Sequence, residues 1–151
     1  YQESETKGNN TDRKKSKKNW NKTTNSSRKR IGIKTDLIEL KTFKTDKKIN
    51  LEKNEILRYL GKDDYVITLD RQGKNITSPK FSNIIKSKID YGYKKLNFII
   101  GSEEGLDEYF KSSFETIAFG NQTWPHLMVR IMLIEQIYRA FEIIKNSRYH
   151  K

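Results

Sequence analysis

The chain has 151 residues, which is enough for one domain of ordinary size, or for one domain with a tail. Its 31 Lys and Arg outnumber its 19 Asp and Glu, and the net charge of +12 favours a polyanionic partner, nucleic acid before membrane. The lack of Cys excludes a disulfide framework, a thiolate zinc site and cysteine catalysis, and two His do not suggest a metal cluster. No apolar run reaches the roughly 18 residues of a membrane span, and the polar first residues lack the apolar core of a signal peptide. The composition predicts a soluble, basic protein of a reducing compartment.

The first thirty residues differ in composition from the rest. They hold ten Lys and Arg but three Asp and Glu, and only two hydrophobic residues, Tyr1 and Trp20. Such a segment buries too little apolar surface to offset the entropy of ordering, so we predict that residues 1–30 are disordered and that residues 31–151 form the folded domain. Two interpretations of the segment stay open: a basic arm on RNA, or a solvated insertion rich in Lys and Asn, which we favour.

Strand-like and helix-like segments alternate from there on. In chain order, the sequence predicts a strand at 35–41, a helix at 51–60 between the N-cap Asn50 and Gly61, a strand at 65–69, a helix from the N-cap Ser78 and Pro79 to Gly92, strands at 96–100 and 115–119, and a last helix at about 126–146. Short connections between such elements imply βαβ units. The predicted fold is α/β, with a mostly parallel sheet flanked by helices.

Three glycine-containing loops follow predicted strands, at 70–73, 101–105 and 120–125. In parallel sheets ligands bind beyond the carboxyl ends of the strands, and glycine lets the backbone approach them closely. The loops contain neither G-x-G-x-x-G nor G-x-x-x-x-G-K-[ST], so a dinucleotide fingerprint and a P-loop are excluded. Backbone amides, small polar groups and few positive charges suit a ligand with an adenine and an amino acid part better than a triphosphate.

The last predicted helix is apolar nearly all round. Its apolar residues cover more than one face of the helix. They are Leu127, Met128, Ile131, Met132, Leu133, Ile134, Ile137, Tyr138, Ala140, Phe141 and Ile144. Such a helix must be buried on both sides. One side can pack on the sheet, and the other is expected to contact a second subunit, with the tail or an upstream helix as the alternative cover.

Four segments carry motifs in a distinctive order: VITLDRQGK at 66–74, FIIGSEEGL at 98–106, TWPHLMVRIMLIEQIYRAF at 123–141 and the terminal YHK at 149–151. Together they resemble the RlmH (YbeA) family of SPOUT-type methyltransferases, which act on pseudouridine in large-subunit ribosomal RNA. The resemblance covers about residues 35–151. There are two departures. The family's opening strand has no counterpart, so the chain is expected to be a fragment or to carry an insertion, and the family's Gly-Gly pair is Gly101-Ser102 here.

The resemblance implies an α/β-knot fold with a C-terminal trefoil knot, S-adenosylmethionine as cofactor, and a homodimer built on the C-terminal helix. Carried over by position, the cofactor-binding residues are Leu69, Gly101, Phe119, Gly120, Asn121, Gln122, Thr123 and Trp124. Leu69 and Trp124 are expected to pack on the adenine or ribose, and the amides of the glycine loops to hold its edge and the methionine part. Thr123 has a second possible role as a cap of the last helix, and Pro125 is expected to be structural.

The implied reaction is methyl transfer to N3 of a pseudouridine. The N3 proton is weakly acidic, so a general base or a cation that stabilises the anion is needed. The candidate catalytic residues are Arg130, His126, Tyr149 and His150. For His126 the alternative is a buried, hydrogen-bonded histidine at a helix start, and for Arg130 it is an ion pair with Glu135 or another carboxylate.

A second function of another class is open, a catalytically silent RNA-binding or ribosome-assembly factor with the same fold. The basic arm and the altered Gly-Ser pair favour it, whereas the nearly complete run of cofactor residues favours the enzyme. A bacterial member of the family would be cytoplasmic. The Lys- and Asn-rich composition, typical of AT-rich genomes, suggests an organelle of plastid or mitochondrial type instead.

Overall fold

The computed structural model describes residues 34–40, 43, 45–102 and 104–150, so the predicted arm at 1–30 lies outside the described residues. The elements in order are α2 (Lys48–Tyr59), β1 (Tyr65–Asn75), α3 (Ser78–Tyr91), β2 (Leu96–Ile100), α4 (Glu108–Ser113), β3 (Glu115–Ala118) and α5 (His126–Ile144). Each predicted helix is present, and so are three of the four predicted strands. The short helix α4 was not predicted.

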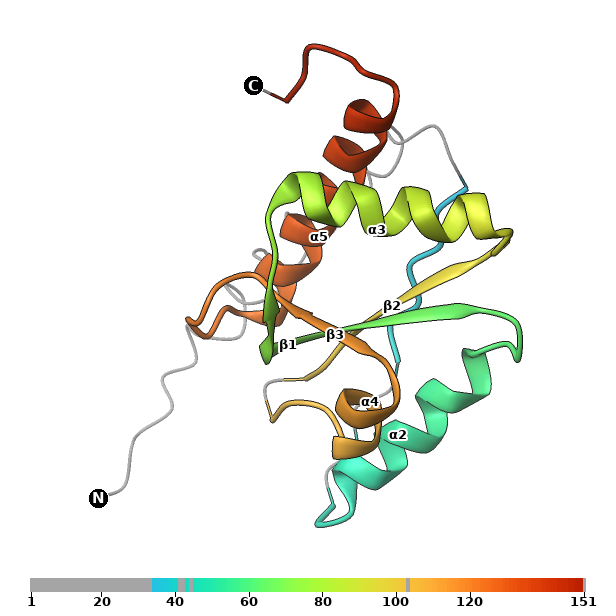
Figure 1. The fold of residues 1–151 in the computed structure, drawn as a ribbon. Helices are drawn as coiled ribbons and strands as arrows, with labels where there is room; N and C mark the ends of the chain where they lie inside the picture. The colour runs from blue at the N-terminus through green and yellow to red at the C-terminus, as the bar shows by residue number, and fades with distance from the viewer. Residues whose placement is uncertain (1–33, 41–42, 44, 103, 151) are drawn as a thin grey trace.

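The three strands form one parallel sheet in the order β2-β1-β3. The central strand β1 pairs with β2 from Tyr65 opposite Leu96 to Leu69 opposite Ile100. Helices α3 and α5 cover one face of the sheet, and α2 and α4 lie on the other side (Figure 1). The predicted α/β architecture, a parallel sheet flanked by helices, is confirmed.

The core consists of two clusters, one on each face of the sheet. The cluster under α3 and α5 contains Ile67, Leu69, Phe81, Ile85, Ile117, Leu133, Ile134, Ile137 and Ala140. The cluster toward α2 and α4 contains Val66, Ile99, Leu106 and Phe110. Because successive side chains of a strand point to opposite faces, Val66 and Ile67 belong to different clusters. Burial on both faces explains why this strand is a nearly continuous apolar run.

Polar contacts fix α3 at its start. Thr77, not the predicted Ser78, caps the helix, because its side chain accepts a hydrogen bond from the Lys80 amide at 3.3 Å. Ser78 instead donates to Gln136 Oε1 of α5 at 2.7 Å, and the buried Ser82 donates to the Ala140 carbonyl at 3.1 Å. These two contacts join α3 to α5, which carries two of the predicted catalytic residues.

Two other predictions were wrong. Residues 34–40 have no regular secondary structure, and Leu37 and Ile38 are exposed; a strand needs a neighbour to satisfy its backbone groups, and no described strand pairs with this segment. Helix α2 begins at Lys48, so Asn50 lies inside it rather than at its N-cap; its last residue is Tyr59, and the extended C-cap Leu60 directly precedes Gly61. The Gly61 amide donates to Asp64 Oδ2 at 2.8 Å, which makes this segment a turn stabilised by a carboxylate.

The segment predicted as the first loop, 70–73, is an irregularity inside β1. Leu69 and Lys74 both lie opposite Ile117 of β3, so the residues between them bulge out of the ladder before pairing resumes. The backbones approach closely here: a Cβ on Gly73 would lie 2.7 Å from the Ile117 carbonyl carbon. Only glycine fits at that point.

Candidate cofactor and catalytic site

The structure joins two of the three predicted loops at the carboxyl edge of the sheet. Asn75, the last residue of β1, donates to Asn121 Oδ1 at 2.8 Å and accepts from the Gly120 amide at 3.0 Å. Arg71 Nη1 reaches Thr123 Oγ1 at 3.5 Å. Sequence reasoning missed Asn75. Two features of the sequence point to this residue: it follows a predicted strand, and its amide side chain can both donate and accept hydrogen bonds.

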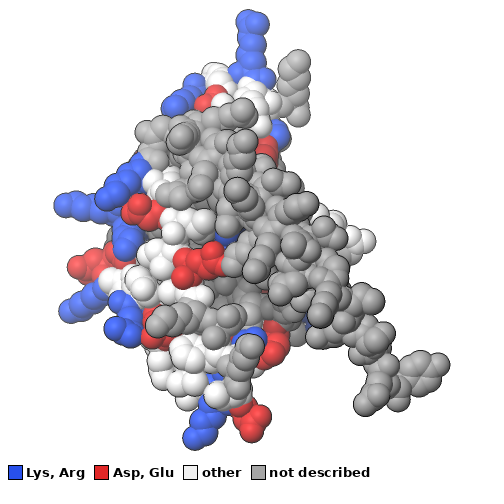
Figure 2. Space-filling model, turned by 180° about the vertical axis from the view of Figure 1, so that it is seen from behind, with Lys and Arg blue, Asp and Glu red and all other residues white. Residues whose placement is uncertain are grey.

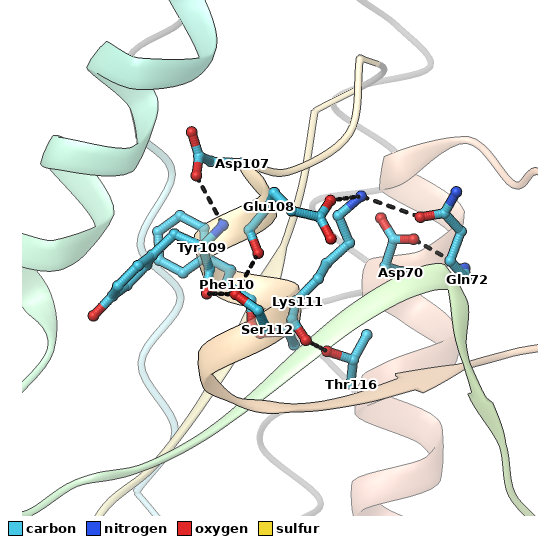
Figure 3. Close-up of polar contacts among 10 residues, drawn as sticks. Asp70, Gln72, Asp107, Glu108, Tyr109, Phe110, Lys111, Ser112 and Thr116 are labelled. Atoms are coloured by element: carbon cyan, nitrogen blue, oxygen red, sulfur yellow. Dashed lines mark hydrogen bonds and ion pairs between the residues drawn. The ribbon is translucent and has the colours of Figure 1, made fainter.

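The bulge of β1 is also held from the other side by α4 (Figure 3). Lys111 of α4 donates to Gln72 Oε1 at 3.2 Å and lies 3.3 Å from a Glu108 oxygen. Within the bulge, Asp70 Oδ1 accepts from the Gln72 amide at 2.9 Å. Contacts from α4 and from the loop after β3 therefore hold the bulge in one conformation, as a preorganised binding site requires.

The third loop follows β2, on the other side of the central strand. Ser102 and Gly105 form an isolated bridge, and the Gly105 amide donates to the Ser102 carbonyl at 2.9 Å. The Ser102 hydroxyl donates to Glu52 Oε2 of α2 at 3.3 Å. The serine that replaces the family's glycine thus ties this loop to α2.

The predicted cofactor residues differ in exposure. Gly120, Asn121, Gln122, Thr123 and Trp124 are exposed, and Gly101 and Phe119 are half-buried. The Trp124 ring is held across its loop, because its indole N–H donates to the Phe119 carbonyl at 3.0 Å. The Leu69 side chain lies in the core under α5 and is only 6% exposed, so at this edge its main chain is what could face a ligand.

Two of the catalytic candidates begin α5. Arg130 is buried, and Glu135, the carboxylate considered as its partner, is bound to Arg139 at 2.8 Å. His126 Nδ1 is buried and has no hydrogen-bond partner within the described part of the chain. An unsatisfied buried nitrogen costs free energy, so His126 has the capacity to bind a ligand group.

The other two candidates lie in the tail, which folds back onto α5. The Tyr149 hydroxyl donates to Glu135 Oε1 at 3.1 Å, and Arg139 Nη1 lies 3.2 Å from His150 Nδ1. The Tyr149 ring packs against Tyr138 at 4.9 Å between centroids and beneath the Arg139 guanidinium at 4.8 Å. Burial, and then the hydrogen bond to Glu135, raise the pKa of Tyr149, and Glu135 likewise raises the pKa of Arg139.

The four catalytic candidates therefore form two separate pairs. The tail contacts Glu135 and Arg139, which follow Arg130 by five and nine positions along α5. At 1.5 Å per residue these separations are about 7.5 and 14 Å along the helix. Within one chain, Tyr149 and His150 therefore contact α5 beyond the turn that carries His126 and Arg130.

We expect the Glu135→Gln substitution to loosen the tail. The neutral amide loses the ion pair with Arg139 and weakens the acceptor of the Tyr149 hydroxyl. If the docked tail loses about 0.5–1.5 kcal/mol of stabilisation, the population of molecules with an undocked tail should rise about 2- to 10-fold. Carboxypeptidase digestion followed by mass spectrometry measures this as faster removal of the last residues.

The control for that experiment is Glu55→Gln, which breaks an exposed pair with Arg58 on α2 and should leave the digestion rate unchanged. Equal rates for wild type and Glu135→Gln would contradict the docking of the tail on α5.

Other features of the surface do not coincide with these residues. A shallow hollow of about 580 Å³ lies at the start of α2, lined by Thr45, Asp46, Lys47, Lys48, Ile49, Asn50, Glu104 and Asp107, and contains none of the predicted site residues. Among the described residues, no three His, Cys, Asp or Glu are grouped as metal ligands would be. None of the helices seen in the described ranges combines the length and apolarity needed to cross a bilayer.

Comparison with known proteins gives a consistent result. Residues 10–150 match the model of a family described as predicted SPOUT methyltransferases. The chain is similar to the ribosomal RNA large subunit methyltransferase H of Carboxydothermus hydrogenoformans, at 41% identity over 113 residues that cover 74% of this chain and 71% of that protein. For the protein of the same name from Mycoplasmopsis agalactiae the identity is 42% over 119 residues, with 76% and 77% covered. For that from Streptococcus suis it is 40% over 135 residues, with 82% and 85% covered.

Proposed function

The chain belongs to the SPOUT methyltransferase family, and on that premise we propose that it methylates N3 of a pseudouridine in large-subunit ribosomal RNA, with S-adenosylmethionine as methyl donor. The resemblance drawn from the four sequence motifs is thereby confirmed at the level of the family. The relatives named above are ribosomal RNA large subunit methyltransferases, which supports the class of substrate. The trefoil knot, the target atom and the roles of single residues are part of the proposal.

The observation that carries the proposal is the joined pair of loops at the carboxyl edge of the sheet. Asn75 holds the run 120–124 against the end of β1, and all five residues of the run are exposed. An exposed run of small polar residues with one tryptophan suits the adenosine and amino acid parts of S-adenosylmethionine. The half-buried Gly101 lies at the end of the neighbouring strand β2, where the methionine part would be bound.

When bound, S-adenosylmethionine supplies an electrophilic methyl group, which the substrate N3 takes as the carbon–sulfur bond breaks. Arg130 stabilises the negative charge that develops on the pseudouridine ring as N3 loses its proton. His126, at the start of α5, is the general base that we propose to accept that proton. The two lie four residues apart on α5, so their side chains share one face of the helix.

Tyr149 and His150 complete the site if the tail reaches it, either from a second subunit or from the same chain. We propose a homodimer through α5. Five apolar residues on the first half of α5 are only half-buried in one chain, namely Leu127, Met128, Val129, Ile131 and Met132, and of these Val129 packs against the core. Light scattering of the purified protein measures the mass of the assembly.

The deciding experiment has two parts. Isothermal titration with S-adenosylmethionine should show one site per chain, and incubation with methyl-labelled cofactor and large ribosomal subunits should label one nucleotide. Mass spectrometry of the digested RNA then identifies 3-methylpseudouridine. A protein that binds the RNA but not the cofactor would be a silent RNA-binding or assembly factor.

The cellular location is a separate proposal. The relatives named above are bacterial, and a bacterial protein of this kind works in the cytoplasm. The alternative, an organellar ribosome, rests on the Lys- and Asn-rich composition. Fluorescence microscopy of the full-length gene product distinguishes the two.

A further inference from the structure

A cluster of tyrosines lies at the amino ends of β1 and β2, the edge of the sheet opposite to the candidate site. The ring of Tyr93 contacts two others, Tyr91 at 5.2 Å in a stacked arrangement and Tyr65 at 5.2 Å in a tilted one. Tyr65 begins β1, whereas Tyr91 ends α3 and Tyr93 follows it. We call these three residues the tyrosine surface.

The outermost ring of this surface is unusually exposed. Tyr91 is 80% exposed, the highest value among the exposed large apolar side chains of the described residues. One face of its ring stacks on Tyr93, and the rest of the ring is open to solvent. Tyr91 belongs to neither core cluster, so the packing of the fold does not account for an aromatic residue here.

Lysines surround the tyrosine surface. The ten residues 86–95 contain four lysines and one acid. Lys88 Nζ lies 4.3 Å from the centre of the Tyr65 ring, and Lys94 and Lys95 are exposed. Figure 2 shows the described basic and acidic side chains interspersed on the face that it draws.

Three carboxylates nearby, those of Asp90, Glu115 and Asp64, have partners within the protein. Asp90 pairs with Lys86 at 2.7 Å, and Glu115 accepts a short hydrogen bond from the Tyr65 hydroxyl. Asp64 accepts from the Gly61 amide and from Asn97, and lies 3.9 Å from Lys95. Lys94 therefore adds an exposed positive charge beside an open aromatic face.

We propose that the tyrosine surface is a second RNA contact, on which an unpaired base stacks against Tyr91 while Lys94 and Lys95 bind the adjoining phosphates. Aromatic rings bind unstacked bases of single-stranded loops and bulges, and lysines bind phosphates with release of counterions. This inference rests on the proposed function, because it takes large-subunit ribosomal RNA as the ligand. An acidic protein would use the lysines but leave the open ring without a stacking partner.

The distance between the tyrosine surface and the cofactor loops indicates which part of the RNA the tyrosine surface would bind. Tyr65 and Leu69 are four steps apart along β1, at about 3.3 Å per step, so the tyrosine surface lies roughly 13 Å or more from the cofactor loops. The target nucleotide cannot occupy both places. The surface therefore binds RNA that flanks the target and contributes affinity rather than chemistry.

The test measures binding of four variants to a ribosomal RNA fragment that contains the target, at two salt concentrations. We expect Tyr91→Ala to weaken binding about 5- to 100-fold, the range of one lost stacking contact, and Tyr91→Phe to retain it. Lys94→Glu should weaken binding and reduce the slope of log affinity against log salt by about one or more. The matched control is Lys80→Glu, an exposed lysine at the other end of α3, which should have a smaller effect. Calorimetry should show unchanged binding of S-adenosylmethionine in all four.

Three results would overturn the inference. Wild-type RNA affinity for Tyr91→Ala excludes stacking, and equal losses for Lys94→Glu and Lys80→Glu indicate only general attraction of charge. If Tyr91→Ala binds the RNA fragment normally but assembled subunits poorly, the partner is a ribosomal protein. Failure of the wild-type protein to bind S-adenosylmethionine or to methylate RNA is a different outcome, which would contradict the proposed function.

Discussion

Replacing Gly101 with Val is expected to abolish the binding of S-adenosylmethionine. A Cβ at this position would lie 2.8 Å from Leu106 Cγ and 3.0 Å from the Gly105 carbonyl carbon, closer than carbon atoms pack. Leu106 belongs to the core cluster toward α2 and α4, so it has little freedom to move. The loop must open to admit the side chain, which displaces the backbone at the end of β2. Isothermal titration measures the loss.

The control for this variant is Ser102→Gly, which restores the family's Gly-Gly pair and adds no bulk. It loses the hydrogen bond to Glu52 and should still bind the cofactor. Thermal unfolding of both variants confirms that they fold. A folded Gly101→Val protein with wild-type affinity would contradict the assignment of the 101–105 loop to the cofactor site.

Replacing Arg130 with Ala should leave the affinity for S-adenosylmethionine nearly intact and lower the single-turnover rate of methylation about 100-fold or more, as expected for the loss of one charge-stabilising donor. The Arg130 side chain is only 9% exposed, so its charge is weakly screened by water. Arg130→Lys keeps the charge but loses the planar fork of donors, so its rate should be intermediate. The measurement uses assembled large subunits as well as free RNA.

The matched control is Arg58→Ala, which removes an exposed arginine of α2 and should change neither rate nor affinity. If Arg130→Ala instead loses cofactor binding and methylates normally at saturating cofactor, Arg130 supports the pocket and its catalytic assignment is wrong.

Local sequence signals predicted most of the elements that position the site. The run YVITL predicted a strand covered on both faces because every residue in it is apolar, aromatic or β-branched, and Val66 and Ile67 do enter opposite clusters. Pro79 and Gly92 predicted the two ends of α3, because proline suits the first turn of a helix and glycine adopts the left-handed conformation that ends one. The apolar surface of α5 predicted its burial in the same local way.

Contacts between distant residues decided the rest. The segment 35–41 has the apolar residues of a strand, but pairing depends on a neighbour that its own sequence does not specify. Residues 70–73 were predicted as a loop. They form a bulge instead, because Lys74 pairs with the same residue of β3, Ile117, that Leu69 pairs with, and the local sequence does not reveal this pairing. Asn75 contacts Gly120 and Asn121, 45 and 46 residues further along the chain, and its position at a strand end does not specify these partners.

The clearest division between sequence and structure lies in α5 and the tail. The motifs at 123–141 and 149–151 by themselves identified the family and the residue types that its chemistry needs, because these depend on the side chains present and their order. The tertiary structure alone decided that Glu135 and Arg139, which lie about 7.5 and 14 Å along the helix from Arg130, hold Tyr149 and His150. That separation follows from how the chain folds back after α5, where the Tyr149 ring packs on Tyr138 and its hydroxyl finds a carboxylate.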